Sequence, residues 1–269
     1  MKKEDHYIEI NRKSWNNRIE THLSSEFYDL DNFKKGKSSL NTIELALLGN
    51  LKGKTILHLQ CHFGQDTISL SRLGAEVTGV DLSDKAIESA KKIAKETHSN
   101  TTFICCDIYD LPKYLDKKFD VVFTSYGTIG WLPDLDKWAK IISKFLKPKG
   151  QFIFVEFHPV VWMFDDDFKT IKYRYFNSGA IVEFENGTYA DKNANITQEY
   201  VAWNHDLSEV INSLISNGLE IAIFNEYDYS PYNCFNKAIE VEPDKFRIEH
   251  LDNKIPMIYS ILAKKKGKV

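Results

Sequence analysis

The stretch TILHLQCHFGQDTISLSRLGAEVTGVDLS, residues 55–83, decides the fold predicted for this chain. An apolar run ends in a tight turn around Gly64, a segment of helical length follows, and a second apolar run stops at Asp81. Strand, turn, helix, strand and acid form the first βαβ unit of a nucleotide-binding α/β fold, in which the acid accepts the ribose hydroxyls. The interval from Gly64 to Asp81 is close to the roughly 20 residues expected when the two strands are neighbours in a parallel sheet.

Further apolar runs continue this alternation of strands and helices. The predicted later strands are residues 102–107, residues 119–125, a fifth strand entered through the LKPKG turn at 146–150 and running to 157, Leu219–Phe224 and Met257–Leu262. One helix between successive runs through residue 157 is typical of a parallel sheet with helices on both faces.

Capping residues mark the predicted helices. Apolar periodicity predicts helices within 8–19 and 39–48, with a loop at 32–37 between them. The predicted helix signals are an N-cap at Ser83, a start at Pro133 and Asp134, a capping pair of Asp206 and Glu209, and a stop at Gly218.

This order of elements resembles that of the class I S-adenosylmethionine-dependent methyltransferases. The first strand of that family usually ends in an acid-x-Gly-x-Gly-x-Gly pattern. Here the acid position is His58, and the three glycine positions are Gln60, His62 and Gly64, so only the last glycine is present. Asp81, Asp107 and the LKPKG turn follow in the family's order, and the resemblance covers roughly residues 51–157 and, less distinctly, 206–264.

The resemblance and the alternation together imply a doubly wound, mostly parallel seven-stranded sheet with an antiparallel last strand. We expect residues 1–50 to form an N-terminal helical cap and residues 51–269 to form the methyltransferase-like Rossmann domain. Residues 158–205 alternate in polarity and contain the hairpin signal Asn186-Gly187, followed by a further strand within 195–203. They predict a small antiparallel insert over the ligand end of the sheet; the alternative is a strand pair that extends the sheet edge.

The substituted turn can be interpreted in two ways. Histidine is among the residues enriched at positive φ, so His62 can occupy a glycine position. The amide of Gln60 can hydrogen-bond the methionine end of the cofactor. The alternative is a degenerate turn in a chain that has lost its cofactor, and the presence of Asp81 and Asp107 argues against it.

The resemblance implies S-adenosylmethionine as the cofactor and predicts where it binds. Asp81 is expected at the ribose, Asp107 with the backbone of Ile108 at the adenine, and the N-terminal aromatics Trp15 and Tyr28 over the methionine end. Aromatic faces attract a sulfonium cation. The predicted cofactor contacts are Trp15, Tyr28, Gln60, Cys61, His62, Gly64, Asp81, Leu82, Ser83, Asp107, Ile108 and Ser125.

The acceptor side is predicted from the ends of the fourth and fifth strands. Tyr126, Trp131 and His158 are expected to line it, and the candidate catalytic residues are His158, Glu156 and Tyr126. Glu156 and His158 are two residues apart on one strand and therefore share a face. His205 either faces the pocket or caps a helix, and each histidine can instead be structural. Methyl transfer is an in-line displacement, so positioning alone can supply much of the catalysis.

Composition and missing motifs narrow the partner. The formal net charge is −3, which gives no basic field for nucleic acid or membrane. The fourth strand ends in Thr124-Ser125-Tyr126-Gly127 and not in the Asn/Asp-Pro-Pro-aromatic motif of many amino-methylating enzymes, and the chain has no Pro-Cys pair. A small-molecule acceptor is therefore the preferred partner. Two other classes stay open: an NAD-dependent oxidoreductase, and a non-catalytic S-adenosylmethionine-binding regulator.

The remaining features predict a protein of the cytoplasm. The start MKKEDHYIEI has no apolar signal region, and no stretch reaches the ~18 apolar residues of a membrane helix. The four cysteines show no paired metal spacing, and Asp165-Asp166-Asp167 is interpreted as a solvated loop, so no metal is expected. The lysines of 264–268 are interpreted as a solvated tail. We expect a monomer or a homodimer.

Overall fold

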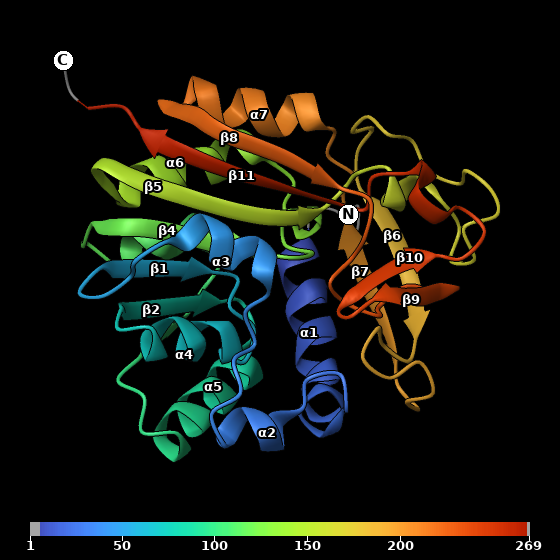
Figure 1. Ribbon diagram of the computed structural model, residues 1–269, viewed down its shortest axis with the longest axis horizontal. Coiled ribbons are helices and arrows are strands. Elements are labelled where there is room, and N and C mark those ends of the chain that lie inside the picture. The colour runs from blue at the N-terminus through green and yellow to red at the C-terminus, as the bar shows by residue number, and fades with distance from the viewer. Residues whose placement is uncertain (1–5, 268–269) are drawn as a thin grey trace.

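A single seven-stranded sheet forms the centre of the molecule (Figure 1). The computed structural model describes residues 6–267. The sheet has the strand order β3-β2-β1-β4-β5-β11-β8. Its strands are β1 (Thr55–Leu59), β2 (Glu76–Asp81), β3 (Thr102–Cys105), β4 (Phe119–Ser125), β5 (Leu146–Phe157), β8 (Leu219–Tyr227) and β11 (Ile258–Lys265).

The direction of the strands confirms the predicted fold class. β1 pairs in parallel with β2 and with β4, and the parallel pairing continues to β3 on one side and β5 on the other. The last strand, β11, lies antiparallel between β5 and β8. A final strand parallel to its neighbours would have indicated a dehydrogenase fold, so this result also speaks against the oxidoreductase alternative.

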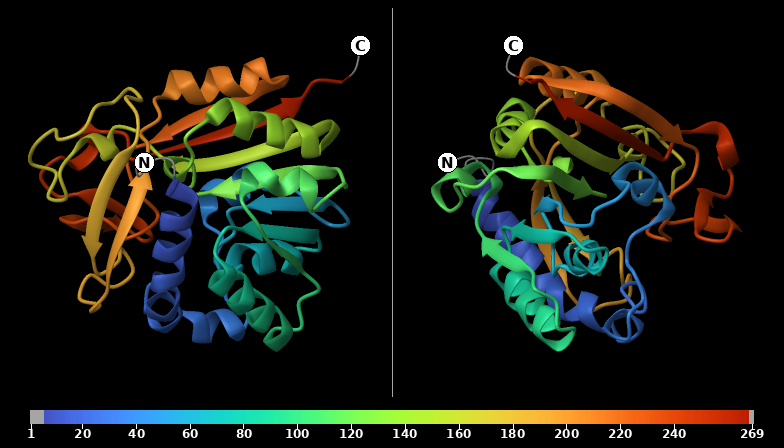
Figure 2. Two further views of the ribbon diagram at one scale, coloured as in Figure 1. Left: turned by 180° about the vertical axis from the view of Figure 1, so that it is seen from behind. Right: turned by 60° about the vertical axis from the view of Figure 1, so that its left-hand side comes forward.

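Helices cover both faces of the sheet, as predicted for a doubly wound fold (Figure 2). α6 (Leu135–Phe145) and α7 (Leu207–Ser216) pack on one face in a core that contains Leu57, Phe154 and Tyr259. α3 (Thr42–Leu48) and α4 (Gln65–Arg72) pack on the other face, and α5 (Asp84–Glu96) joins α4 in a neighbouring cluster. Alternate side chains of each strand therefore enter opposite layers of the core.

The predicted helix caps are confirmed by hydrogen bonds. Ser83 accepts from the backbone N–H of Ala86, Asp134 from that of Lys137, and Asp206 from that of Glu209. The Glu209 carboxylate does not accept from the backbone N–H of Asp206 in return, because it lies 2.9 Å from Nδ1 of His205.

The segment predicted as an N-terminal cap contains α1 (Tyr7–Ser24), α2 (Leu30–Lys34) and α3. The prediction of a loop at 32–37 is wrong for its first half, where α2 forms. Phe33 is buried there, and the Arg72 guanidinium lies 4.4 Å from the centre of its ring. This packing against a distant residue stabilises the turn of helix, and no local pattern could indicate it.

Residues 158–205 contain the predicted antiparallel hairpin. β6 (Ile181–Asn186) pairs with β7 (Thr197–Ala202) in a two-stranded sheet of their own, so the alternative of an extended sheet edge is wrong. Asn186 and Gly187 begin a longer loop and do not form a two-residue turn, because Gly187 and Ile196 are joined by a backbone hydrogen bond across it. The 3₁₀ turn η4 (Val161–Met163) precedes the hairpin.

A second hairpin was not predicted. β9 (Ala238–Glu242) and β10 (Lys245–Ile248) lie between β8 and β11 in the sequence and pair with each other. The 3₁₀ turn η5 (Asp252–Lys254) follows them. The two hairpins lie together at the carboxyl ends of the parallel strands (Figure 1). β9 is largely exposed, and β10 has only four residues, so the pair gives little of the apolar alternation from which strands are predicted.

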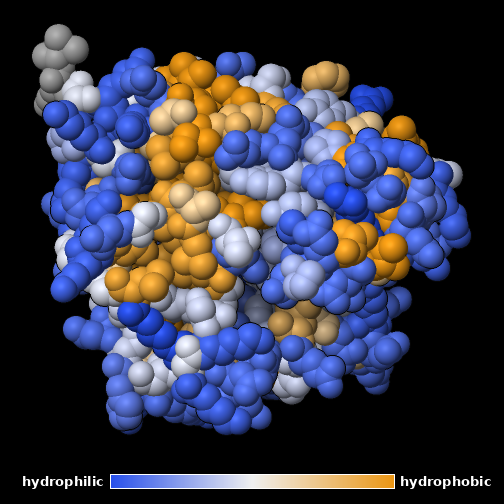
Figure 3. Space-filling view, viewed as in Figure 1, coloured by the Kyte–Doolittle hydropathy of each residue, from blue (hydrophilic) through white to orange (hydrophobic). Residues whose placement is uncertain are grey.

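The surface has apolar side chains along the face formed by α3 and β8 (Figure 3). Leu45 of α3 and Ile223 of β8 are among the exposed large apolar residues. None of the helices within residues 6–267 is both long and apolar enough to cross a membrane. The prediction of a solvated tail is wrong for Lys264 and Lys265, which belong to β11, where Nζ of Lys265 donates to the carbonyl oxygen of Leu146 at 3.1 Å. Lys268 lies outside the described residues.

Candidate active site

A cavity of about 1050 Å³ opens at the carboxyl ends of the parallel strands. Its floor is the turn after β1 together with the ends of β2, β4 and β5, and its roof is α1 and the β6–β7 insert. The segment after β8 adds Tyr232, Cys234 and Phe235 to the wall. Parallel sheets place ligands at this edge because the crossover connections diverge there.

The turn after β1 accommodates its substituted glycine positions. Gln60 and His62 both adopt positive φ, 55° and 51°, as does Gly64 at 81°. A Cβ at Gly64 would lie 2.7 Å from the ring of Phe103, so this position needs glycine. The other two positions leave room for side chains, and the turn therefore keeps the glycine-type backbone with one glycine only.

Asp81 is oriented by this turn. Its two carboxylate oxygens accept hydrogen bonds from the backbone N–H groups of His62 and Ser83, each at 2.8 Å. Burial raises the pKa of Asp81 to about 6. Each oxygen keeps lone pairs that can accept from ligand hydroxyls.

Gln60 supplies an acceptor with no protein donor. Its Nε2 donates to the carbonyl oxygen of Thr128 at 2.8 Å, which fixes the orientation of the amide. Its Oε1 is buried and has no hydrogen-bond partner among the described residues. A buried acceptor without a donor costs free energy, so this oxygen is suited to an N–H or O–H group of a ligand.

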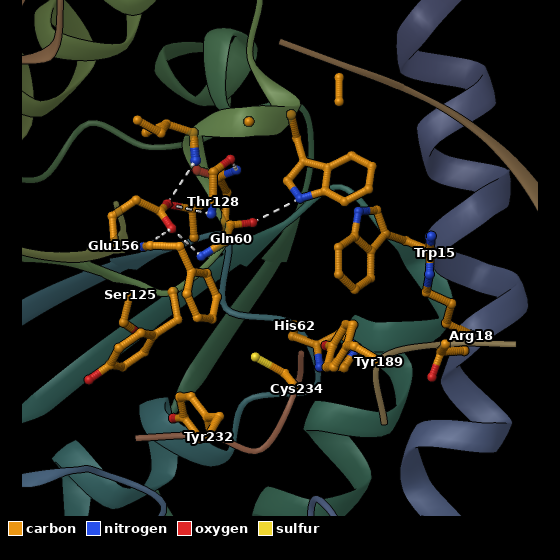
Figure 4. Close-up of a pocket in the computed structure, with 18 of the residues that line it drawn as sticks. Trp15, Arg18, Gln60, His62, Ser125, Thr128, Glu156, Tyr189, Tyr232 and Cys234 are labelled. Atoms are coloured by element: carbon orange, nitrogen blue, oxygen red, sulfur yellow. Dashed lines mark hydrogen bonds between the residues drawn. The ribbon is translucent and has the colours of Figure 1, made fainter. Parts of the chain in front are cut away.

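Glu156 is a structural residue of the cavity floor. Its carboxylate accepts from the backbone N–H groups of Thr128 (2.7 Å), Ile129 (3.2 Å) and Phe157 (2.7 Å), and also from that of Gly127 (Figure 4). Burial raises its pKa. These donors fill the carboxylate, so Glu156 holds the turn before η3 (Ile129–Trp131), and the geometry does not support its prediction as a base.

His158 does not line the cavity, contrary to the prediction. Its ring stays on the face of Glu156, as predicted, but it points across β11, where its centre lies 6.0 Å from that of the Tyr259 ring. The ring instead contacts Glu226 through Nε2 at 2.9 Å and accepts from the N–H of Val160 at Nδ1. Burial lowers its pKa. Both ring nitrogens are thus used away from the cavity.

His205 reaches the cavity edge but is also held on both sides. Its Nε2 lies 2.8 Å from the carbonyl oxygen of Leu132, and its Nδ1 lies 2.9 Å from Glu209. It therefore links α7 to the segment before α6. This agrees with the alternative that His205 is a structural residue.

Tyr126 lines the cavity and contacts an acid that was not predicted. It adopts a positive φ of 51°, and its hydroxyl donates to Glu44 at 2.6 Å. Burial raises the pKa of Glu44 to about 7. Backbone strain of this kind often marks functional sites. Glu44 lies far away in sequence on α3, so only the packing of the cap brings the pair together.

Asp66 is a second acid that the sequence analysis missed. It accepts from the hydroxyls of Ser39 at 2.6 Å and Ser125 at 3.2 Å, and burial raises its pKa. Ser125, a predicted cofactor contact, is therefore bound to Asp66. The position of Asp66 two residues after Gly64 was the available signal, because the first turn of the following helix faces the cavity.

The roof is aromatic and carries one buried cation. The Trp15 ring lies 5.4 Å from that of His62 and 5.1 Å from that of Trp131 (Figure 4). Arg18 is buried and pairs with Glu185 of the insert at 2.6 Å. Tyr28 shares a hydroxyl–hydroxyl hydrogen bond with Tyr189. Glu185 and Tyr189 could not be predicted, because their contacts depend on how the insert folds back.

The structure brings nearly all of the predicted cofactor residues into this one cavity. Cys61, Leu82, Asp107 and Ile108 line it together with the residues described above. Ser83 does not line it and acts through Asp81. Burial raises the pKa of Cys61 well above its ordinary value, so its thiol stays protonated.

Comparison with known proteins agrees with this geometry. Residues 56–150 match the family model described as a methyltransferase domain. Residues 56–150 therefore carry a methyltransferase domain, and this domain is similar to that of the class I S-adenosylmethionine-dependent methyltransferases. The cofactor of this family is S-adenosylmethionine, and the paired lone pairs of Asp81 and the unpartnered Oε1 of Gln60 fit its ribose hydroxyls and its ammonium group.

Two of the curated relatives match half of the chain or less. The chain is 31% identical over 136 residues to the ubiquinone biosynthesis O-methyltransferase of Idiomarina loihiensis, covering 49% of this chain and 56% of that protein. It is 35% identical over 104 residues to the protein of that name from Coxiella burnetii, covering 39% and 44%. The chain thus spans about half the length of the curated relatives it matches.

Solved structures share the fold over most of the chain. A putative S-adenosylmethionine-dependent methyltransferase from Listeria monocytogenes superposes with a TM-score of 0.61 at 22% identity, over 83% of this chain and 95% of that one. One from Mesorhizobium loti gives 0.57 at 19% identity, over 86% and 100%. At these identities the likeness shows the fold alone.

Proposed function

We propose that this protein transfers the methyl group of S-adenosylmethionine to a small-molecule acceptor. The observation that carries the proposal is the turn after β1: Asp81 presents an oriented carboxylate, and Gln60 presents a buried oxygen that lacks a donor. Bound S-adenosylmethionine supplies an electrophilic methyl group. Asp81 would bind the ribose, Gln60 the ammonium group, and Asp107 with Ile108 the adenine.

The cavity supports transfer by positioning. Trp15, Tyr28 and Trp131 enclose it and exclude water, and aromatic faces favour a sulfonium cation. The relatives named as O-methyltransferases motivate an acceptor with a hydroxyl group. An acceptor that must lose a proton would pass it to the hydroxyl of Tyr126 as that hydroxyl passes its own proton to Glu44, whose carboxylate accepts from it at 2.6 Å.

The remaining parts of the proposal concern the setting of the reaction. We place the protein in the cytoplasm as a monomer or a homodimer, with no nucleic-acid partner. Residues 1–50 act as a cap and residues 51–269 as the catalytic domain, in which 158–205 serve as the lid. Support comes from the net charge of −3 and from the packing of α1 on β7.

Titration calorimetry separates this function from its alternatives. Binding of S-adenosylmethionine and S-adenosylhomocysteine, without binding of NAD, is expected. Transfer of radiolabelled methyl from S-adenosylmethionine to a panel of neutral phenols, catechols and amines then tests catalysis. Cofactor binding with no transfer across the panel would favour the non-catalytic regulator, and binding of NAD alone would overturn the proposal.

A further inference from the structure

His62 is where the floor of the cavity touches its roof. Its Nε2 lies 3.3 Å from Nδ1 of His22 on α1, and Nε2 of His22 lies 3.2 Å from the hydroxyl oxygen of Thr188 in the insert. The ring also lies 5.4 Å from that of Trp15 and 5.4 Å from that of Tyr28. The two imidazoles thus connect the turn after β1 to both parts of the roof, and Figure 4 shows His62 on the floor beside Trp15 of α1 and Tyr189 of the insert.

The roof is itself one joined unit. The side chain of Asn11 on α1 both donates to the carbonyl oxygen of Val201 at 2.8 Å and accepts from its N–H at 2.9 Å. Arg18 pairs with Glu185, and this guanidinium is buried. A contact that holds α1 to the floor therefore also holds the insert.

At the outer end of the floor, α1 makes a separate contact. The Asn16 side chain accepts from the hydroxyl of Ser83 at 2.6 Å and donates to Asp84 at 2.8 Å. The latter bond is exposed, whereas His22 is fully buried. Solvent competes less for the inner contact in the closed state, so this contact contributes more to closure than the exposed one.

A glycine substitution at His62 can remove the ring without changing the conformation of the turn. This residue occupies a glycine position of the family at a φ of 51°. Its backbone N–H donates to Asp81, and glycine would keep that bond and relieve the strain of positive φ. Any loss in a glycine variant is therefore due to the imidazole.

We propose that His62 is a positioning residue that holds the roof closed over the bound cofactor. Restoring the family's glycine in this chain then weakens cofactor binding and does not improve it. The inference rests on the proposed function, because it assumes that the cavity binds S-adenosylmethionine and its product. The proposal gives a role to the histidine that stands at position 62 in place of the family's glycine.

Stopped-flow measurement of S-adenosylhomocysteine dissociation tests the proposal, with Trp15 and Trp131 as fluorescent reporters in the cavity wall. The His62→Gly variant should release S-adenosylhomocysteine about tenfold faster, while the association rate changes little. His98→Gly is the matched control, because His98 is exposed and has a φ of 53°. It relieves the same strain and should leave the dissociation rate unchanged.

His22→Phe removes the same contact from the roof side and should accelerate release similarly, with no further acceleration in the double variant. If His62→Gly does not fold, this second variant decides the question. An unchanged dissociation rate in either folded variant overturns the proposal, and so does a lowered thermal midpoint of the unliganded protein with no change in release. Failure of the wild type to bind S-adenosylhomocysteine would instead refute the proposed function.

Discussion

Replacing Asp81 by asparagine is the sharpest test of the cofactor site. The wild-type carboxylate accepts two backbone N–H groups at 2.8 Å and keeps lone pairs for two ribose hydroxyls. In Asp81→Asn the amide NH₂ must face either the N–H of His62 or that of Ser83. One backbone donor then loses its acceptor, and the ribose loses a charged partner.

The expected loss follows from these contacts. A hydrogen bond to a charged group is worth about 1.5–3 kcal/mol, so S-adenosylhomocysteine should bind roughly 10–150-fold more weakly. Calorimetry at pH 8 measures this with Asp81 ionised, because its pKa is about 6. As pH falls through 6 the wild-type carboxylate becomes protonated, and its affinity should fall toward that of the variant.

Asp110→Asn is the control for this measurement. Its side chain is about half exposed and pairs with Lys113, so the substitution changes the charge near the adenine end without touching Asp81. Affinity should stay within about twofold of wild type. Wild-type affinity of a folded Asp81→Asn protein at pH 8 would refute the assignment of the ribose to this residue.

Three further substitutions test the site and its frame. Gln60→Leu removes the unpartnered oxygen and should weaken binding of S-adenosylhomocysteine by about tenfold but not that of methylthioadenosine, which lacks the amino-acid group; equal effects on both ligands would contradict the ammonium assignment. His158→Ala should lower the free energy of unfolding by about 1–3 kcal/mol through the lost contact with Glu226 and leave cofactor affinity unchanged, as measured by denaturation and calorimetry. Gly64→Ala should destabilise the protein by about 1–3 kcal/mol, because its Cβ would lie 2.7 Å from the ring of Phe103 at a φ of 81°; a thermal midpoint equal to that of wild type would show that the turn can shift.

The sequence predicted the part of the site that is local in the chain. Gln60, Gly64 and Asp81 belong to one βαβ unit, whose strand and helix periods and turn residues are set by neighbours in sequence. Their positions at the floor are confirmed. The prediction that His158 lines the cavity was wrong because alternation fixes only the face of a side chain, and on that face the ring points away from the cavity to Glu226 on β8.

Residues that meet from distant elements were outside the reach of the sequence. The Tyr126 and Glu44 pair requires the packing of α3 beside β4, and the Arg18 and Glu185 pair requires the insert to fold onto α1. Glu44 lies three residues after the N-cap Asn41, a spacing that indicates a capping box and not a partner for Tyr126. The buried face of α1 includes polar residues such as Asn11 and His22. Hydrophobic periodicity could therefore predict the helix but not the residues that this face contacts.

The sequence by itself therefore determined the parallel strands of the sheet and the residues of the cavity floor, because these follow from local periodicity and from the rules that connect neighbouring strands. The order of the strands came from the structure. Only the tertiary structure decided how the cavity is closed and which groups share it. Closure depends on hydrogen bonds between α1 and β7, which are almost two hundred positions apart in the chain. In the sequence, the polar residues that make such contacts look the same as polar residues of the surface. They become hydrogen-bonded partners only when folding buries them together.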